Sequence, residues 1–329
     1  MEPDSPSLRR TLRQTLRDAD AGEPSPLVAS LRWGPVDGPP RSLSYGCASD
    51  AIFPLTSITK PFVAAATLSL VAKGRLTLVD RVAERRASFR GPDKRRVTIG
   101  DLLEHTSGLP YVTEADRKLR AAKATAAEFA SAADVCPLVV SPGTAATYSN
   151  AGYSVLGALL EDEAEASLSS ILRSEVFEPR EMTTASLGSP ASRPMRVAIE
   201  RDDEADAALD WNSEYWQTVA APWGGAFGTA DDVAAFAQSL PTPLLTNPLR
   251  TSETNCWRLG FQERWPGHRN TLGDLVPPET VGHYGASGTL FWRTRSQVFV
   301  ALTNRPVGRR PRLLQRLSNV VAASLFGWR

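Results

Sequence analysis

The chain has 329 residues, of which 42% are hydrophobic and 22% are charged, as expected of a globular protein with a large core. Its 37 basic and 36 acidic residues leave a net charge of +1, which argues against nucleic acid and anionic membranes as partners. Three scattered cysteines and three histidines predict neither a disulfide framework nor a metal site.

The N-terminal segment lacks the apolar stretch of a signal peptide. Leu8, Leu12 and Leu16 follow the spacing of a helix that lies on an apolar surface. Two short strands are predicted next, at 27–33 and 43–47. No apolar stretch of the chain is long enough to cross a bilayer. These features predict a cytoplasmic protein with no membrane partner.

Helical periodicity begins at Ser57 and ends near Lys73. Further helices are predicted at 99–104, 121–133, 152–176, from a capping box at Thr229, and at 313–326. Strands are predicted in the C-terminal part at 280–284, 289–293 and 298–302. Because strands lie at both ends and helices fill the middle, we predict an α+β fold. Its antiparallel sheet is built from both termini and flanked by helices, with a mostly helical lobe inserted in the middle.

Ser57-Ile58-Thr59-Lys60 stands at the start of the helix predicted for 57–73. A spacing of three residues places the hydroxyl and the amine on one helix face, where they can share a proton. The helix N-terminus favours the oxyanion of acyl transfer, and burial lowers the pKa of a lysine. By itself the pattern is common, and a capping Ser followed by a surface Lys is the alternative interpretation.

Two further segments carry groups suited to acyl transfer. In Tyr148-Ser149-Asn150, a nearby ammonium would lower the pKa of the phenol and make Tyr148 a candidate base. The Asn150 amide can donate to and accept from a substrate. In segment 282–289, glycines on a predicted strand allow a ligand to approach a backbone N–H. The alternatives are a buried Tyr beside a helix cap and a Gly-rich bulge around a packed His.

The ordered set resembles the penicillin-recognising serine enzymes: Ser57-x-x-Lys60, then Tyr148-x-Asn150, then His283-x-Gly285. The tyrosine version is similar to class C β-lactamases and to the D-alanyl-D-alanine carboxypeptidases, D-aminopeptidases, esterases and acyltransferases close to them. Further similarity lies at 103–110, 178–182 and 224–232. The resemblance implies one class C β-lactamase-like catalytic domain over 1–329. Its α/β lobe would span about 1–80 and 205–329, and its helical lobe about 81–204.

The resemblance also implies a role for each motif residue. Ser57 would attack the substrate carbonyl and become acylated. Lys60 and Tyr148 would share the base role, and either could take the proton. The N–H groups of Ser57 and Ala286 would form the oxyanion hole. The predicted substrate-binding residues are Asn150, which would hold an amide or ester oxygen, and His283, Tyr284 and Gly285. The resemblance implies no cofactor.

Some positions depart from the family pattern or suggest other roles. His283 stands where β-lactamases usually carry Lys, and a neutral His is a weaker anchor for a substrate carboxylate. We expect Trp223, Tyr284 and Trp292 to line the cleft. His105 belongs to the turn 105–110, which predicts a structural role for it. His268 is given no role.

The predicted function is a serine hydrolase that forms an acyl-enzyme on a small ester, amide or β-lactam, in the first place a carboxylesterase. Alternatives within the family are a β-lactamase, a D-alanyl-D-alanine carboxypeptidase or D-aminopeptidase, and an acyltransferase. The lack of an export signal argues against a carboxypeptidase of the cell wall. A non-catalytic binding module that keeps the fold is the alternative from another class. The sequence leaves open the substrate, the acyl acceptor and the oligomeric state.

Overall fold

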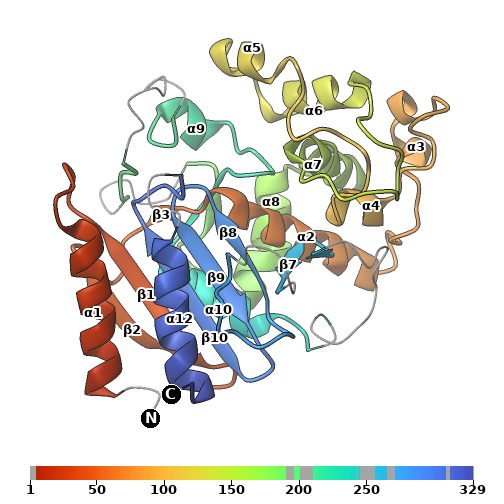
Figure 1. The fold of residues 1–329 in the computed structure, drawn as a ribbon. Coiled ribbons are helices and arrows are strands. Elements are labelled where there is room, and N and C mark those ends of the chain that lie inside the picture. The colour runs from red at the N-terminus through yellow and green to blue at the C-terminus, as the bar shows by residue number, and fades with distance from the viewer. Residues whose placement is uncertain are drawn as a thin grey trace.

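A seven-stranded antiparallel sheet, in the order β2-β1-β10-β9-β8-β7-β6, organises the molecule (Figure 1). The computed structural model describes residues 5–189, 196–200, 210–242, 244, 256–264, 271–308 and 312–328. Strand β1 (Ala29–Pro35) pairs along its whole length with β10 (Gln297–Thr303), so strands from the N-terminal and C-terminal parts of the chain are neighbours inside the sheet. This confirms the predicted antiparallel sheet built from both termini.

The other strands are short. The large sheet is completed by β2 (Arg41–Tyr45), β6 (Trp257–Arg258), β7 (Phe261–Glu263), β8 (Val281–Gly285) and β9 (Thr289–Arg293). A separate three-stranded sheet consists of β3 (Phe53–Pro54), β5 (Ala226–Gly228) and β4 (Ser186–Leu187).

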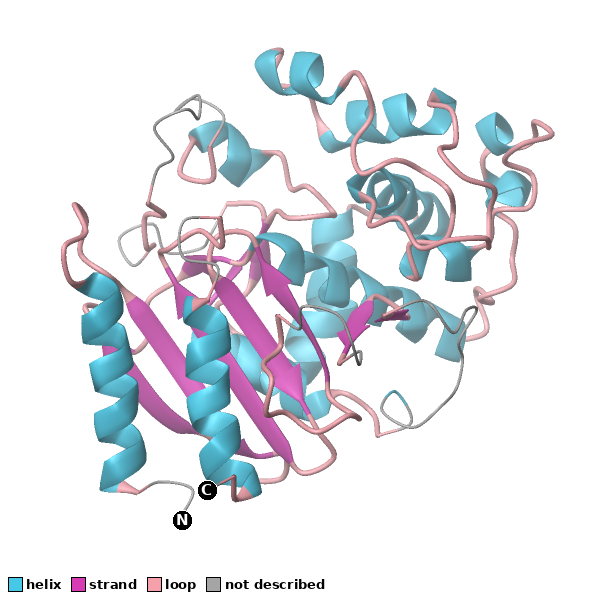
Figure 2. Ribbon diagram, viewed as in Figure 1, coloured by secondary structure: helices cyan, strands magenta, loops and turns pink. Residues whose placement is uncertain are grey.

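Helices cover both faces of the large sheet, as Figure 2 shows. Helices α1 (Pro6–Asp20) and α12 (Leu313–Phe326) lie side by side on one face, while α10 (Ala230–Ser239) contacts the other. Because side chains alternate along a strand, β10 sends Phe299 and Ala301 toward α1 and α12 and its other apolar residues toward α10.

The same alternation corrects one prediction. Trp292 of β9 lies on the α12 face, is fully buried there, and donates from Nε1 to Ser318 Oγ at 2.8 Å. The prediction that Trp292 lines the cleft is therefore wrong.

The middle of the chain is mostly helical, as predicted. Helices α3 to α7 gather beside the sheet in Figure 1: α3 (Val82–Arg85), α4 (Ile99–Leu103), α5 (Asp116–Ala121), α6 (Ala126–Val135) and α7 (Asn150–Ala164). Next come α8 (Leu168–Leu172), a π-helical turn (Arg173–Phe177), a 3₁₀ turn (Glu178–Arg180) and α9 (Glu214–Thr218). The lobe boundaries near residues 81 and 204 stay a prediction.

Two predicted helices are each divided. The helix predicted at 121–133 is interrupted where Lys123 has a positive φ of 54° and Thr125 caps α6. The helix predicted at 152–176 ends at Glu165, whose φ is 51°, and resumes at α8 after the N-cap Ser167. Among the described residues, no helix has the length and apolar character needed to span a bilayer.

Candidate active site

Ser57 lies in a 3₁₀ turn (Thr56–Ile58) that leads directly into α2 (Thr59–Ala72). The preceding residue, Thr56, has a positive φ of 45°, an uncommon backbone conformation for a β-branched residue. The Thr59 hydroxyl donates to the Thr56 carbonyl at 2.6 Å and accepts from the N–H of Ala226 at 2.9 Å. The sequence predicted a helix starting at Ser57; the first turn is instead 3₁₀, held by these contacts.

The connection between β8 and β9 is bonded to the segment that carries Ser57. Thr56 Oγ1 accepts the N–H of Ser287 at 3.3 Å, and Ser287 Oγ donates to the Pro54 carbonyl at 2.7 Å. The Thr289 hydroxyl donates to the Leu55 carbonyl at 3.1 Å. These bonds fix the exposed Ala286, the predicted second oxyanion donor, to the nucleophile segment.

Gly285 allows this close approach. A Cβ at position 285 would clash with the side-chain oxygens of Thr56 and Thr289 and with the Leu55 carbonyl. We expect Gly285→Ala to push β8 away from Ser57 and lower kcat by on the order of 10² to 10³-fold, the loss typical of one oxyanion donor. Gly91→Ala is the control, since nothing lies within 4 Å of the added atom. Steady-state kinetics of hydrolysis measure both variants; unchanged kcat in Gly285→Ala would contradict the expectation.

Lys60 points from α2 to Ser57 and is fully buried. Its Nζ lies 3.3 Å from Ser57 Oγ and 2.8 Å from the Trp223 carbonyl oxygen. It also stands over the rings of Tyr148 and Tyr153, 4.6 Å and 5.6 Å from their centroids. Burial lowers the pKa of Lys60 well below its ordinary value. The amine is thus prepared to accept a proton from Ser57.

Tyr148 precedes α7, its ring centroid lies 4.6 Å from Lys60 Nζ, and hydrogen bonding with Ser57 acts to lower the pKa of its phenol. Burial raises the pKa of the Tyr148 phenol, and the bond to Ser57 opposes this only in part. The sequence had led us to expect a lowered pKa from the neighbouring ammonium. That expectation is wrong, because the same burial that shields the phenol also favours the neutral form of Lys60. Tyr148 is therefore a neutral hydroxyl, suited to passing a proton on.

Asn150 is the first residue of α7, and its N–H donates to the Tyr111 carbonyl at 2.8 Å. Ser149 caps the helix by accepting the N–H of Gly152 at 2.8 Å and donates to the Pro110 carbonyl at 2.7 Å. These bonds attach the Tyr148 segment to the turn at 105–111. The Asn150 side chain lines a small hollow together with Trp223.

His283 of β8 is buried and its ring centroid lies 6.2 Å from that of Tyr148. Nδ1 donates to the Tyr284 carbonyl at 2.7 Å, so the neutral ring carries its proton there. Burial, helped by the Lys60 charge, lowers the pKa of His283 to about 3. His283 is a neutral side chain beneath the partly exposed Tyr284, and it offers no positive charge to a substrate at neutral pH.

Two residues beside Tyr148 were not predicted for the site. Trp257 of β6 lies 5.1 Å from Tyr148 and 5.2 Å from His283, measured between ring centroids. No motif marks Trp257 in the sequence. His105 lies 4.6 Å from Tyr148, and its motif was interpreted as a turn only. His268, the third histidine, is outside the described residues.

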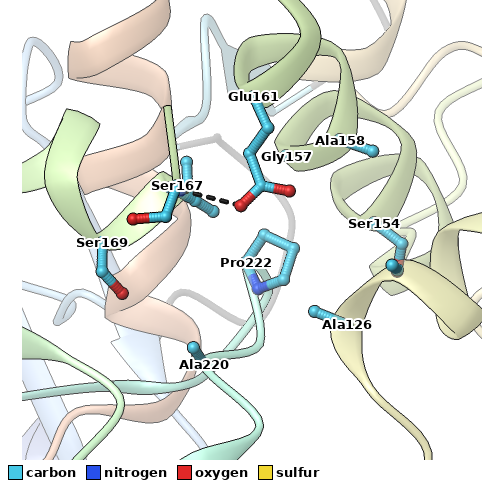
Figure 3. A pocket seen from close by; sticks show the side chains of 11 residues that line it. Ala126, Ser154, Gly157, Ala158, Glu161, Ser167, Ser169, Ala220 and Pro222 are labelled. Atoms are coloured by element: carbon cyan, nitrogen blue, oxygen red, sulfur yellow. Dashed lines mark hydrogen bonds between the residues drawn. The ribbon is translucent and has the colours of Figure 1, made fainter. Parts of the chain in front are cut away.

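A second hollow, of about 110 Å³, lies along α7 away from these residues (Figure 3). Ser154, Gly157 and Glu161 line it from α7, and Pro222 faces them. Glu161 accepts the N–H of Leu168 at 2.8 Å. Its lining includes neither Ser57, Lys60 nor Tyr148, so the reaction site lies elsewhere.

The sequence and the fold of this chain are both similar to those of known proteins. The family model described as Beta-lactamase matches residues 29–323. Esterase EstB of Burkholderia gladioli is 32% identical over 296 residues, covering 74% of this chain and 72% of the relative. Penicillin-binding protein 4 of Amycolatopsis lactamdurans is 29% identical over 274 residues, covering 76% and 70%. The solved structure of EstCE1, a hydrolase with promiscuous acyltransferase activity, superposes with a TM-score of 0.78 at 18% identity, covering 96% of this chain and 98% of that one.

Proposed function

Because the chain belongs to the Beta-lactamase family of serine hydrolases, we propose that it cleaves uncharged carboxylic esters through an acyl-enzyme on Ser57. One observation carries this proposal: the Lys60 amine lies 3.3 Å from the Ser57 hydroxyl oxygen and 4.6 Å from the centre of the Tyr148 ring. Acyl transfer requires a nucleophile, a base and a proton donor, and Ser57, the Lys60 amine and the Tyr148 phenol can supply them. Family membership also favours an enzyme over a non-catalytic binding module.

The proposed reaction assigns one proton movement to each group. Neutral Lys60 takes the proton of Ser57 as Oγ attacks the ester carbonyl. The N–H groups of Ser57 and Ala286 stabilise the oxyanion. Tyr148 donates its proton to the departing alcohol and recovers one from the Lys60 ammonium. Water then attacks the acyl-enzyme, giving up a proton along the same path, and releases the acid and free Ser57.

The polarity of the site supports esters over β-lactams, which carry a carboxylate. Of the two basic side chains predicted at the site, Lys60 is buried with a lowered pKa and His283 is neutral. A substrate carboxylate would therefore lose water without gaining either of these two side chains as a cationic partner. The name of Esterase EstB, a relative of 32% identity, agrees with an ester substrate.

A matched pair of nitrophenyl esters tests this preference, one with an uncharged acyl chain and one whose chain ends in a carboxylate. We expect kcat/KM for the uncharged ester to be higher by about tenfold or more, equal to at least about 1.4 kcal/mol. A chromogenic cephalosporin measured alongside should turn over more slowly than the uncharged ester. Preference for the charged ester or for the cephalosporin would contradict the proposal. Adding a short alcohol shows whether it competes with water for the acyl group.

A further inference from the structure

A single residue, His105, holds the backbone on both sides of Tyr148. The His105 carbonyl accepts the N–H of Thr147 at 2.8 Å. Its ring nitrogen Nδ1 accepts the N–H of Ser149 at 3.1 Å. The residues before and after Tyr148 are thus bonded to the same partner, which restricts rotation of the backbone from which the phenol projects.

The His105 ring also packs against the Tyr148 ring. It is 1% exposed, and its centroid lies 4.6 Å from that of Tyr148, 5.3 Å from Tyr153 and 4.8 Å from Trp257. The Tyr148 ring also contacts Trp257, at 5.1 Å between centroids, and the Lys60 amine, which stands 4.6 Å from the Tyr148 centroid. The ring is therefore held from several directions.

His105 takes this position at a cost to stability. Its backbone has a positive φ of 60°, a conformation uncommon for residues other than glycine. Because Nδ1 accepts a hydrogen bond, the proton of the neutral ring is on Nε2, which is buried with no partner in the described part of the chain. Burial above all, then Lys60 and His283, lowers the pKa of His105 well below its ordinary value, which keeps Nδ1 free to accept. Backbone strain and an unpaired N–H in one residue are features that cluster at functional sites.

We propose that His105 is a positioning residue that holds the Tyr148 hydroxyl against Ser57 through the Thr147 and Ser149 hydrogen bonds. The inference rests on the proposed function, because it takes Tyr148 to be the proton carrier. His105 touches no reacting atom in this account; it acts through the placement of Tyr148.

Two substitutions at position 105 distinguish the effect of losing the hydrogen bond to Ser149 from the effect of disturbing the fold. Asn and Gly both tolerate a positive φ, but only Asn carries an acceptor attached to Cγ, where the His ring has Nδ1. We expect His105→Gly to lower kcat by about 10²-fold with KM nearly unchanged, since small misplacements of a catalytic group have effects of this size. His105→Asn should recover kcat to within about tenfold of the wild type. Both variants are compared at a temperature where circular dichroism shows them folded.

A double substitution then shows whether His105 acts through Tyr148. In a Tyr148→Phe background, which lacks the hydroxyl, His105→Gly should change the rate of acylation by an activated ester only a few-fold. Full additivity of the two effects, or equal kcat in the Asn and Gly variants, would overturn the inference. These outcomes differ from a failure of the proposed function, which would show as undiminished turnover in Ser57→Ala.

Discussion

Replacing Ser57 with alanine will lower kcat for ester hydrolysis by on the order of 10⁴ to 10⁶-fold, the range seen when a catalytic nucleophile is removed. Ser57 Oγ lies 3.3 Å from the Lys60 amine, which also stands over the Tyr148 ring. The hydroxyls of Thr56 and Ser287 cannot substitute for it. Thr56 Oγ1 and Ser287 Oγ are buried and lie 3.0 Å from each other in a hydrogen bond.

The matched control for this substitution is Ser69→Ala on α2, the helix that follows the Ser57 turn. Ser69 Oγ donates to Glu175 at 2.6 Å and is not part of the site. Steady-state kinetics with a nitrophenyl ester, corrected for spontaneous hydrolysis, should show Ser69→Ala within a few-fold of the wild type. Ser57→Ala with kcat within tenfold of the wild type would contradict the proposed nucleophile.

Replacing Lys60 with methionine will change activity and stability in opposite directions. We expect kcat to fall by about 10³-fold, as for loss of a general base, and the melting temperature to rise. The stability gain follows from the lowered pKa of the buried amine. Below the ordinary pKa of lysine, the unfolded chain binds this proton more tightly than the folded chain does, so Lys60 destabilises the fold at neutral pH. A flexible apolar side chain of similar length removes that cost.

The pH dependence of the melting temperature tests whether the gain in Lys60→Met comes from the buried amine. The gain in melting temperature should be larger at neutral pH than in alkaline solution, because it shrinks as the pH rises toward the ordinary lysine pKa, where the unfolded chain also loses the proton. Lys60→Arg keeps a charge that cannot be lost, so it should lose both activity and stability. Calorimetry across pH measures these differences; a lower melting temperature for Lys60→Met, or near-normal turnover, would contradict the account.

The sequence was most informative where periodicity and motif order coincide. The Leu8, Leu12 and Leu16 stripe predicted a helix on an apolar surface, and all three side chains are buried beneath α1. The strands near both termini predicted a shared sheet, which β1 and β10 form. The spacing of Ser57 and Lys60 predicted their contact, because side chains three residues apart lie on one face of a helical turn, whether α or 3₁₀.

Properties that depend on tertiary environment were beyond the sequence. The direction of the Tyr148 pKa depends on burial by residues distant in the chain, including the Trp257 and His105 rings. The position of Trp292 also depends on tertiary structure. The register of β9 turns this side chain toward α12, and a tryptophan in a strand does not itself reveal which face it occupies. The role that we infer for His105 depends on its bond to Ser149, 44 residues away. Turn chemistry at 105–110 gives no sign of that partner.

The measurement that most directly tests the central claim is the intact mass of the protein after exposure to an activated serine probe. We expect one added probe mass on the wild type and on Ser69→Ala, located by peptide mapping at Ser57, and none on Ser57→Ala. A nitrophenyl ester should produce the corresponding acyl-enzyme transiently. An equal adduct on folded Ser57→Ala, or no adduct on the folded wild type with either reagent, would contradict the proposal that Ser57 is the nucleophile.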